Sequence, residues 1–554
     1  MSRAPVIVTA LAALCFLSCA PADDPSESDA PGVTDAAAPD DAAAEVAAPD
    51  VEPAEDLATL DLPEEAEAPA QPLPWANVFL ADPDENGGKT SMVQLEHITA
   101  ADGALTGEFA NVSNCLKEAG GAVVSLDTGG FPVTVHVCHE VQTVFPDEHG
   151  NYIKVKPPKN IKDGNDKFAE VMAYYHVDAM HDYFRDVHGH EAVDVSLYAI
   201  VNFEVSLMGA GWMPIDNAAY LPEGSLDELG VDLKYDDDLI VMGQGQYLDY
   251  SYDGDVIRHE YTHFSVGADR LLGYAYDELG FDDAPLSINE ALADFFTSSV
   301  YGDPVLGAYS LGGSARNLEE FRRCPDHYLG EVHYDGQIVS SALWRLRGMI
   351  GAEWTERLAY GALTECGATT NFDEFADALY DQAGNVYAAS APPGTLDAVR
   401  KVMELHGVDG CRRVIPADAP STKKRTLLIP GSWSLGMEQF SKYVPAPLQL
   451  ELADRGRQGT VVLQAKVQAT GLSDLLGPPE EPNVWLAVRA GQPVSYTYEP
   501  KAKMQRDMLV KPAKLGGSTF RWTIPARSLP AGTLYLQLVN FTGIDVAVTG
   551  LDLL

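Results

Sequence analysis

Two histidines four residues apart, with a glutamate directly after the first, constrain this chain more than any other feature. His259, Glu260 and His263 form an HExxH element, and Asp253 and Asp255 before it are suited to begin a helix. On a helix, residues four apart lie on one face, so both imidazoles can reach one ion. Glu260 lies about 100° round the helix from His259, beside the ion's position, where a general base belongs.

A second predicted helix supplies a third ligand. It carries Glu290 and Asp294, four residues apart. A catalytic zinc is held by three protein ligands and keeps a fourth position open, so Glu290 completes the set with the two histidines. Asp294 can then accept the second ring proton of a ligand histidine. HExxH alone also occurs on solvated helices, and Ser287 with Glu290 is also a capping box, but the two helices together favour a metal site.

These two segments resemble the zinc-binding helices of the thermolysin-like gluzincin metallopeptidases, most closely those of the fungalysin-type branch. The resemblance covers about residues 166 to 410. It implies an α+β fold, a two-lobed zinc peptidase, here with a β-rich N-terminal region and a C-terminal β-sandwich. It also implies one catalytic zinc on His259, His263 and Glu290, with Asp294 behind a ligand histidine. Internal peptide bonds would be hydrolysed by zinc-bound water that Glu260 activates.

The same resemblance implies roles for two residues that complete the catalytic machinery. His333 corresponds to the family histidine that stabilises the oxyanion, and either Glu331 or Asp326 could orient it. Tyr274 or Tyr276 would supply the active-site phenol. The spacing between the two zinc helices is longer than in thermolysin-type members, which leaves both tyrosines open, and we predict Tyr276.

Three further residues resemble substrate contacts of the family. The segment 216–220, followed by 240–243, resembles the edge strand on which family members lay the substrate backbone, with contacts from Asn217 and the Ala218 carbonyl. A plain turn and strand is the alternative. Arg316 resembles the arginine that binds the substrate carbonyl on the leaving side, and a structural ion pair is its alternative.

The first twenty residues read as an export signal. A cationic start at Arg3 precedes an apolar run from 6 to 17, and small residues surround Cys19. Cys19 resembles the acylated cysteine of bacterial lipoproteins, so we predict an outer-membrane or cell-surface protein whose only membrane link is that lipid. A freely secreted protein is the alternative. Residues 21–72, rich in Ala, Pro, Asp and Glu, predict a disordered acidic tether.

The rest of the chain changes pattern twice. Short segments of alternating apolar and polar residues predict a β-rich region over 73–165. Helical periodicity then predicts the peptidase domain over 166–412. Short strand-like segments return after it and predict a β-sandwich accessory domain over 413–554. Export makes disulfides possible. We expect a bridge between Cys115 and Cys138 and a second pair among Cys324, Cys366 and Cys411.

The charge balance limits the partners. A net charge of -45, from 82 acidic against 37 basic residues, repels phosphate backbones. We therefore expect no nucleic acid as a partner. Protein or peptide substrates are what the family resemblance implies, and we expect a monomeric chain. Calcium is a second cofactor that the acidic clusters 236–238 and 282–283 allow, although solvated loops explain these clusters equally well.

Two other functions compete with the endopeptidase. A gluzincin aminopeptidase would carry Gly-x-Met-Glu-Asn before HExxH, whereas the similar run 436–439 follows it. A surface-displayed binding lipoprotein with a vestigial peptidase fold is the alternative from another class, because a fold alone does not establish an activity.

Overall fold

A computed structural model of the chain describes residues 73–116, 123–127, 132–160, 165–207, 209, 211–224, 237–245, 248–312, 315–435, 437–454, 459–470, 481–498, 501–528 and 531–554. The predicted export signal, Cys19 and the tether 21–72 lie outside these residues. Residues 74–554 belong to one compact unit. No helix within the described ranges is long and apolar enough to cross a bilayer.

A mixed sheet dominates the first part of the described chain. Within the described residues it has eight strands, with a path β4-β5-β7-β10-β9 and with β3, β6 and β8 paired beside it. The strands are β3 (Ala110–Leu116), β4 (Val123–Asp127), β5 (Pro132–Val137), β6 (His139–Val141), β7 (Leu197–Leu207), β8 (Trp212–Pro214), β9 (Ala218–Leu221) and β10 (Leu239–Gly243). A separate hairpin joins β1 (Trp75–Val78) to β2 (Ser91–Gln94).

The pairing of β3 crosses the region boundary that the sequence pattern predicts at residue 165. β3 runs parallel to β7, with Ala110 opposite Leu197 and Asn114 opposite Val201. Residues 73–165 therefore share a sheet with the strands that follow helix α2. Parallel pairing joins segments that are far apart in the sequence. Local periodicity therefore does not predict which strands pair.

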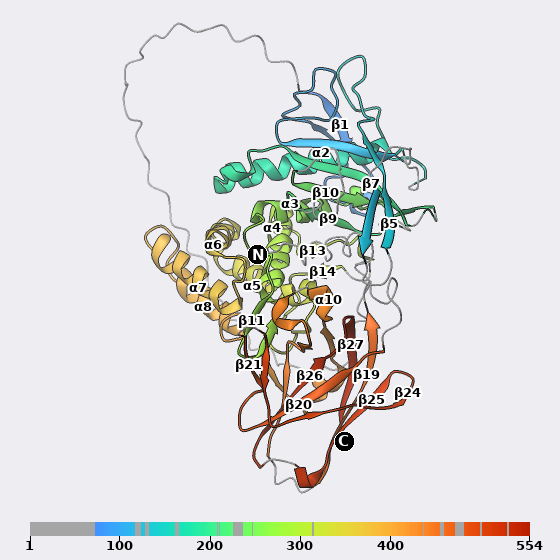
Figure 1. The fold of residues 1–554 in the computed structure, drawn as a ribbon. Helices are drawn as coiled ribbons and strands as arrows, with labels where there is room; N and C mark the ends of the chain where they lie inside the picture. Colours follow the sequence, from blue (N-terminus) through green and yellow to red (C-terminus); the bar gives the residue numbers. More distant parts are fainter. Residues whose placement is uncertain are drawn as a thin grey trace. The chain divides into compact units, whose positions relative to one another are not determined.

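Helix α2 (Lys167–Asp182) packs on β3 and β7 and against helix α3. Figure 1 shows α2 next to α3. Asp166 caps its start, because the Asp166 side chain accepts a hydrogen bond from the Phe168 N–H at 2.8 Å. A π-helical turn (Tyr183–Val187) continues it to His188.

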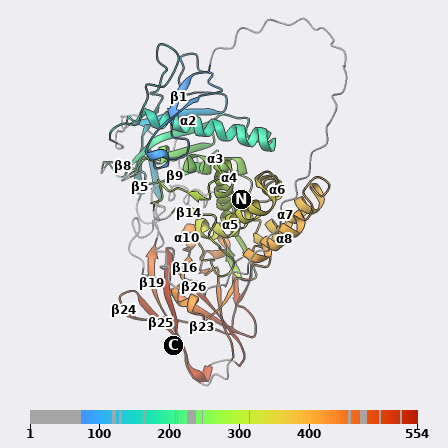
Figure 2. The ribbon, with the colours of Figure 1, turned by 180° about the vertical axis from the view of Figure 1, so that it is seen from behind.

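The region predicted to be mainly helical contains six long helices among the described residues: α3 (Gly254–Val266), α4 (Ala284–Tyr301), α5 (Val332–Ile350), α6 (Ala352–Glu365), α7 (Phe372–Asp381) and α8 (Thr395–His406). Helix α4 lies between α3 and α5. Its Ile288, Leu292 and Phe295 are completely buried, which accounts for much of its stability. In both views α6, α7 and α8 lie side by side (Figures 1 and 2).

Two sheets form the last part of the chain. In the part that the structure describes, one sheet has the order β15-β18-β26-β20-β23 with β17 beside β26, and the other has the order β16-β27-β19-β25-β24. Their strands are β15 (Val414–Pro416), β16 (Thr426–Ile429), β17 (Val444–Pro445), β18 (Gln449–Leu452), β19 (Val461–Thr470), β20 (Val484–Ala490), β23 (Met508–Val510), β24 (Ala513–Gly516), β25 (Thr519–Ile524), β26 (Leu534–Asn540) and β27 (Asp545–Leu553). A small hairpin joins β21 (Ser495–Thr497) and β22 (Lys503–Gln505).

Strand β19 shows why these sheets pack together. It buries Val461, Leu463 and Val467 and exposes Lys466, which is the alternation of a strand with one covered face. Apolar residues of both sheets belong to one core cluster, which continues into the helical region.

The described cysteines form two disulfides. Cys115 bonds to Cys138, as predicted, and Cys324 bonds to Cys411. Cys366 is free and buried. The second bridge joins the segment before α5 to the segment just before β15.

Candidate active site

Helices α3 and α4 bring the three predicted metal ligands together. The Nε2 atoms of His259 and His263 are 3.1 Å apart. A Glu290 carboxylate oxygen lies 3.1 Å from His259 Nε2, and the other lies 3.7 Å from His263 Nε2. The helix places both imidazoles on one face because the two residues are four apart.

The donor set fits a zinc ion. Ligand bonds of about 2.0–2.1 Å in tetrahedral geometry separate neighbouring ligand atoms by about 3.3 Å, close to the three distances between His259, His263 and Glu290. Two nitrogens and one carboxylate are also the ligand types that a catalytic zinc takes. His259 is 6% exposed, so the cluster is largely shielded from solvent.

Each histidine of the cluster is oriented by a partner at its Nδ1 atom. A carboxylate oxygen of Asp294 lies 3.1 Å from His259 Nδ1, and the Asn289 side-chain oxygen lies 2.7 Å from His263 Nδ1. If each Nδ1 carries the proton, each Nε2 is left with a free lone pair. Sequence reasoning missed Asn289, although its position directly before Glu290 on α4 could have indicated it.

Arg316 forms an ion pair with Asp294. Its Nε and Nη2 donate to one Asp294 oxygen at 3.0 and 2.7 Å, from the short strand β14 (Arg316–Asn317). Burial raises the pKa of Asp294, but Arg316 and His259 lower it more, so the net shift is downward. Arg316 is 9% exposed. This is the structural ion pair that the sequence left open, and it puts the guanidinium beside the metal-ligand cluster.

Glu260 faces the edge of the mixed sheet. Its carboxylate accepts a hydrogen bond from the backbone N–H of Tyr220, on β9, at 2.8 Å. β9 ends the sheet path, and its only sheet neighbour among the described strands is β10. The Asn217 carbonyl accepts from Gly243 N–H at 2.9 Å, on the β10 side. Because neighbouring residues alternate, Ala218 and Tyr220 direct their backbone polar groups away from β10.

The N-terminus of α5 carries His333 beside Glu331. His333 Nδ1 lies 2.7 Å from a Glu331 carboxylate oxygen, and His333 Nε2 lies 3.6 Å from Glu290. Burial raises the pKa of Glu331, but His333 and two backbone N–H groups lower it more, so Glu331 stays charged. Asp326, the other candidate to orient His333, is 57% exposed and pairs with Arg323 at 3.5 Å.

Tyr276 lies apart from this cluster, on a hairpin of β11 (Ala275–Asp277) and β12 (Gly280–Asp282). Its ring is 4.4 Å from that of Tyr498 and 6.1 Å from that of Phe440, and its hydroxyl accepts from Gln439 at 3.4 Å. None of its described contacts is with the metal-ligand cluster. Aromatic packing from the last part of the chain holds the Tyr276 ring, and its role as the active-site phenol stays a prediction.

Tyr274, the other candidate phenol, has different surroundings. Its ring lies 5.1 Å from Phe281. Burial raises its pKa, and Asp545, Asp283 and Glu331 raise it further.

The acidic clusters considered for calcium have protein partners. The Tyr328 hydroxyl donates to Asp282 and Asp283. Asp238 accepts from the Tyr220 hydroxyl at 2.5 Å, and Asp236 lies outside the described residues. Calcium binding there stays a prediction. Glu96 and His97, which follow β2, and Asp182, the last residue of α2, form another group of potential ligands and line a pocket of about 400 Å³.

Known proteins resemble the chain over part of its length. No family model matches it. It is 24% identical over 374 residues to the thermostable neutral protease NprT of Geobacillus stearothermophilus, which covers 56% of this chain and 63% of that protein. It is 25% identical over 290 residues to the bacillolysin of Bacillus caldolyticus and to the thermolysin of Alicyclobacillus acidocaldarius, 44% of this chain and 48% and 47% of those proteins. The chain thus spans less than two thirds of the length of each of these relatives. The similarity supports a relationship to the thermolysin-like peptidase family and does not distinguish its branches.

Proposed function

We propose that the chain is a zinc-dependent metalloendopeptidase of the gluzincin type, nearest the fungalysin-type branch, that hydrolyses internal peptide bonds. One observation carries the proposal. Three zinc-type ligand atoms converge from His259, His263 and Glu290 while Glu260, the potential general base, reaches the free edge of β9. The similarity to named neutral proteases and thermolysins supports the same reaction class.

In this proposal the metal site is held by the three converging side chains. Zinc, when bound, supplies a Lewis acid for polarising the scissile carbonyl and activating water. Asp294 and Asn289 keep the Nδ1 protons of the two histidines in place, so that both Nε2 atoms point to the metal.

The substrate would bind as an added strand on β9. The outward backbone groups of Ala218 and Tyr220 are free of β10 and can pair with an extended peptide, while the Asn217 side chain holds its flank. The ion pair with Asp294 would hold Arg316 in place without excluding its other role, so in this proposal Arg316 also binds the carbonyl on the leaving side. The bound peptide would either replace the Tyr220 N–H as the hydrogen-bond partner of Glu260 or lie beside that N–H. Either position brings the scissile bond close to the Glu260 carboxylate.

Glu260 then takes the proton of the attacking water and passes it to the leaving amine. The developing oxyanion receives a hydrogen bond from His333 Nε2, while Glu331 holds the opposite ring nitrogen. Such a preorganised donor contributes about 3 kcal/mol in the transition state. For the second donor we favour Tyr274, because Tyr498 and Phe440 hold the ring of Tyr276.

We also propose that the chain acts outside the cytosol. Its disulfides Cys115–Cys138 and Cys324–Cys411 are stable only under oxidising conditions, which supports the export that the N-terminal signal predicts. A lipid at Cys19 remains part of this proposal.

The test combines metal analysis with casein digestion by the purified chain. We expect one zinc per chain and internal cleavage that a zinc chelator abolishes and added zinc restores. Glu260→Gln should keep the zinc and lose the cleavage. Release of amino-terminal residues alone would indicate an aminopeptidase, and zinc without any hydrolysis would indicate a vestigial, binding protein. Absence of zinc would contradict the proposal.

A further inference from the structure

The hairpin between the two metal-binding helices is held by the last part of the chain. We call residues 275–282 the site hairpin and residues 413–554 the β-domain. Three consecutive carbonyls of the hairpin turn accept hydrogen bonds from the β-domain. Asp277 accepts from the Tyr498 hydroxyl at 2.8 Å, Glu278 from the Tyr496 N–H at 2.9 Å and Leu279 from the Gln537 amide at 3.0 Å.

Arg413 adds a charged contact to the same hairpin. It is 3% exposed, and its Nη2 donates to the Asp277 carboxylate at 2.5 Å while Nη1 donates to the Phe281 carbonyl. Its Nε lies 3.7 Å from Asp282. A planar guanidinium can hold several oxygens at once in one geometry, which a lysine cannot. Arg413 therefore fixes both strands of the hairpin.

The loop before His333, residues 324–331, is held from the same side. Arg425 of the β-domain donates to the carbonyls of Pro325, Tyr328 and Asp326 at 2.9, 2.8 and 2.6 Å. The Leu428 N–H donates to the Leu329 carbonyl at 3.0 Å.

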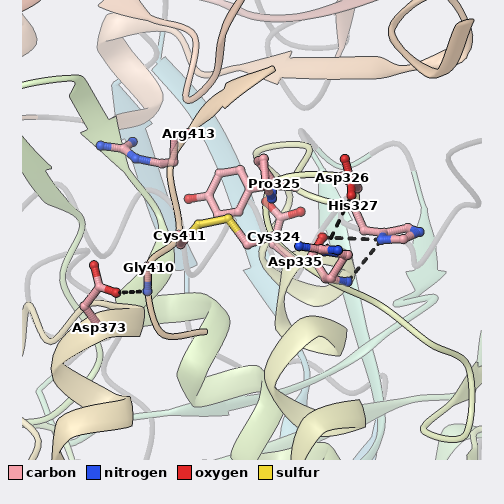
Figure 3. The surroundings of a disulfide bond; sticks show 12 residues. Cys324, Pro325, Asp326, His327, Asp335, Asp373, Gly410, Cys411 and Arg413 are labelled. Carbon is pink, nitrogen blue, oxygen red and sulfur yellow. Dashed lines mark hydrogen bonds and ion pairs between the residues drawn. A yellow bond between two sulfur atoms is a disulfide. The ribbon is translucent and has the colours of Figure 1, made fainter. Parts of the chain in front are cut away.

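A disulfide and a buried carboxylate tie this loop on its other sides. Figure 3 shows the bond from Cys324 to Cys411, with Arg413 just beyond it and Asp335 close to the loop. Asp335 is completely buried and accepts from the N–H groups of Leu329, Gly330 and Glu331 at 2.7, 2.7 and 3.2 Å.

Two glycines show how closely the β-domain approaches. A Cβ on Gly280, in the site hairpin, would lie 2.6 Å from Pro445. A Cβ on Gly330, directly before Glu331, would lie 2.7 Å from the Leu428 carbonyl oxygen and 2.8 Å from Pro447. Both glycines also have positive φ, 118° and 91°, which other residues rarely adopt. The backbone at both places is thus shaped by contact with the β-domain.

The segments that the β-domain contacts are close in sequence to the proposed catalytic groups. The site hairpin follows Tyr274 and ends directly before α4, which carries Glu290. The loop ends at Glu331, which caps α5 and holds the His333 ring. The Tyr328 hydroxyl joins the loop to the hairpin through Asp282 at 2.8 Å.

We propose that the β-domain is a positioning part of the catalytic site, which holds the site hairpin and the His333 loop through Arg413, Gln537 and Arg425. The proposal rests on the proposed peptidase function for its kinetic consequence. It assigns Arg413 and Tyr498 as positioning residues, which touch neither metal nor substrate. A displacement of about 1 Å at a transition-state donor can cost about a hundredfold in rate. Loss of these contacts should lower kcat, while zinc content and KM change little.

The test uses matched pairs of variants of the full chain. Tyr498→Phe removes a hydroxyl-to-carbonyl hydrogen bond to the hairpin, whereas the control Tyr443→Phe removes one of the same kind, to Ala502 at 2.7 Å, inside the β-domain. Arg413→Lys keeps the charge and loses the fork. Its control, Arg521→Lys, loses a contact to Gln464 at 2.9 Å within the β-domain.

Three quantities are measured for each variant: kcat and KM on a fluorogenic peptide, zinc per chain, and amide hydrogen exchange of residues 275–282 and 324–331. We expect Arg413→Lys to lower kcat about tenfold, with zinc retained and KM within about twofold. Exchange in both segments should become faster. Tyr498→Phe should lower kcat about threefold with faster exchange of the hairpin. Both controls should match the wild type.

The outcomes separate this proposal from the proposed function. Wild-type kcat and exchange in folded Arg413→Lys and Tyr498→Phe would overturn the positioning role. Equal losses in the controls would also overturn it, because a general loss of stability would then be the cause. A wild-type chain without hydrolysis would contradict the peptidase function alone. Exchange would still decide whether the β-domain restrains the two segments, and Tyr498→Phe decides it if Arg413→Lys does not fold.

Discussion

The two halves of the candidate site are held in place by different means. The metal-ligand half lies on α3 and α4, where a four-residue spacing puts His259 and His263 on one face. The loop half, which carries His333 and the site hairpin, depends on partners far along the chain. Asp277 and Arg413 are 136 residues apart, and Leu279 and Gln537 are 258 apart. Metal binding can therefore survive changes that disturb transition-state stabilisation, and the predictions below separate the two.

The largest effect is expected from removal of a ligand in the metal half. His259→Ala should lose the zinc and reduce hydrolysis to background, because the two remaining ligands leave the ion weakly held. Metal analysis after dialysis and casein digestion measure both. His139→Ala, which truncates a histidine whose side chain is 46% exposed, is the control. One zinc per chain retained in His259→Ala would show that the ligand set is different.

Removal of His333 tests the loop half. His333→Ala should lower kcat about a hundredfold or more while one zinc stays bound, because it removes a donor to the oxyanion and no ligand. Glu331→Gln should give a smaller loss in kcat, since the ring remains and only its orientation is weakened. Steady-state kinetics and metal analysis decide. A change confined to KM would place His333 in substrate binding instead.

Asp294→Asn tests how the metal half is supported from behind. The change removes the charge that His259 and Arg316 share, so zinc affinity should fall about 10- to 100-fold. Titration with zinc in the presence of a competing chelator measures the affinity. At saturating zinc, kcat should return to a large part of the wild-type value. An unchanged affinity would show that Asp294 supports only the arginine.

The smallest effects should distinguish the two tyrosines. Tyr274→Phe should lower kcat about tenfold if its hydroxyl is the second donor to the oxyanion. Tyr276→Phe should change kcat less, because that ring packs on Tyr498 and Phe440 and lies away from the ligands. Kinetics of the two variants side by side provide the measurement. The reverse ranking would support Tyr276 as the active-site phenol.

Much of the local structure could be predicted from the sequence. The helix start at Asp253 and the bridge between Cys115 and Cys138 are both present. Caps, periodicity and short loops act between residues a few positions apart, and the sequence states those relations directly. The same holds for the two histidines and Glu260, whose relative directions follow from the helix.

Tertiary structure decided the relations that no local pattern contains. It placed β3 beside β7 and brought the Tyr220 N–H to Glu260. It also turned Tyr276 toward the β-domain. Each of these contacts joins segments whose separation depends on how the whole chain packs, and burial of the shared core sets that packing. The ligand types and their spacing on each helix were determined by the sequence itself, and their assembly with the loops was determined by the fold.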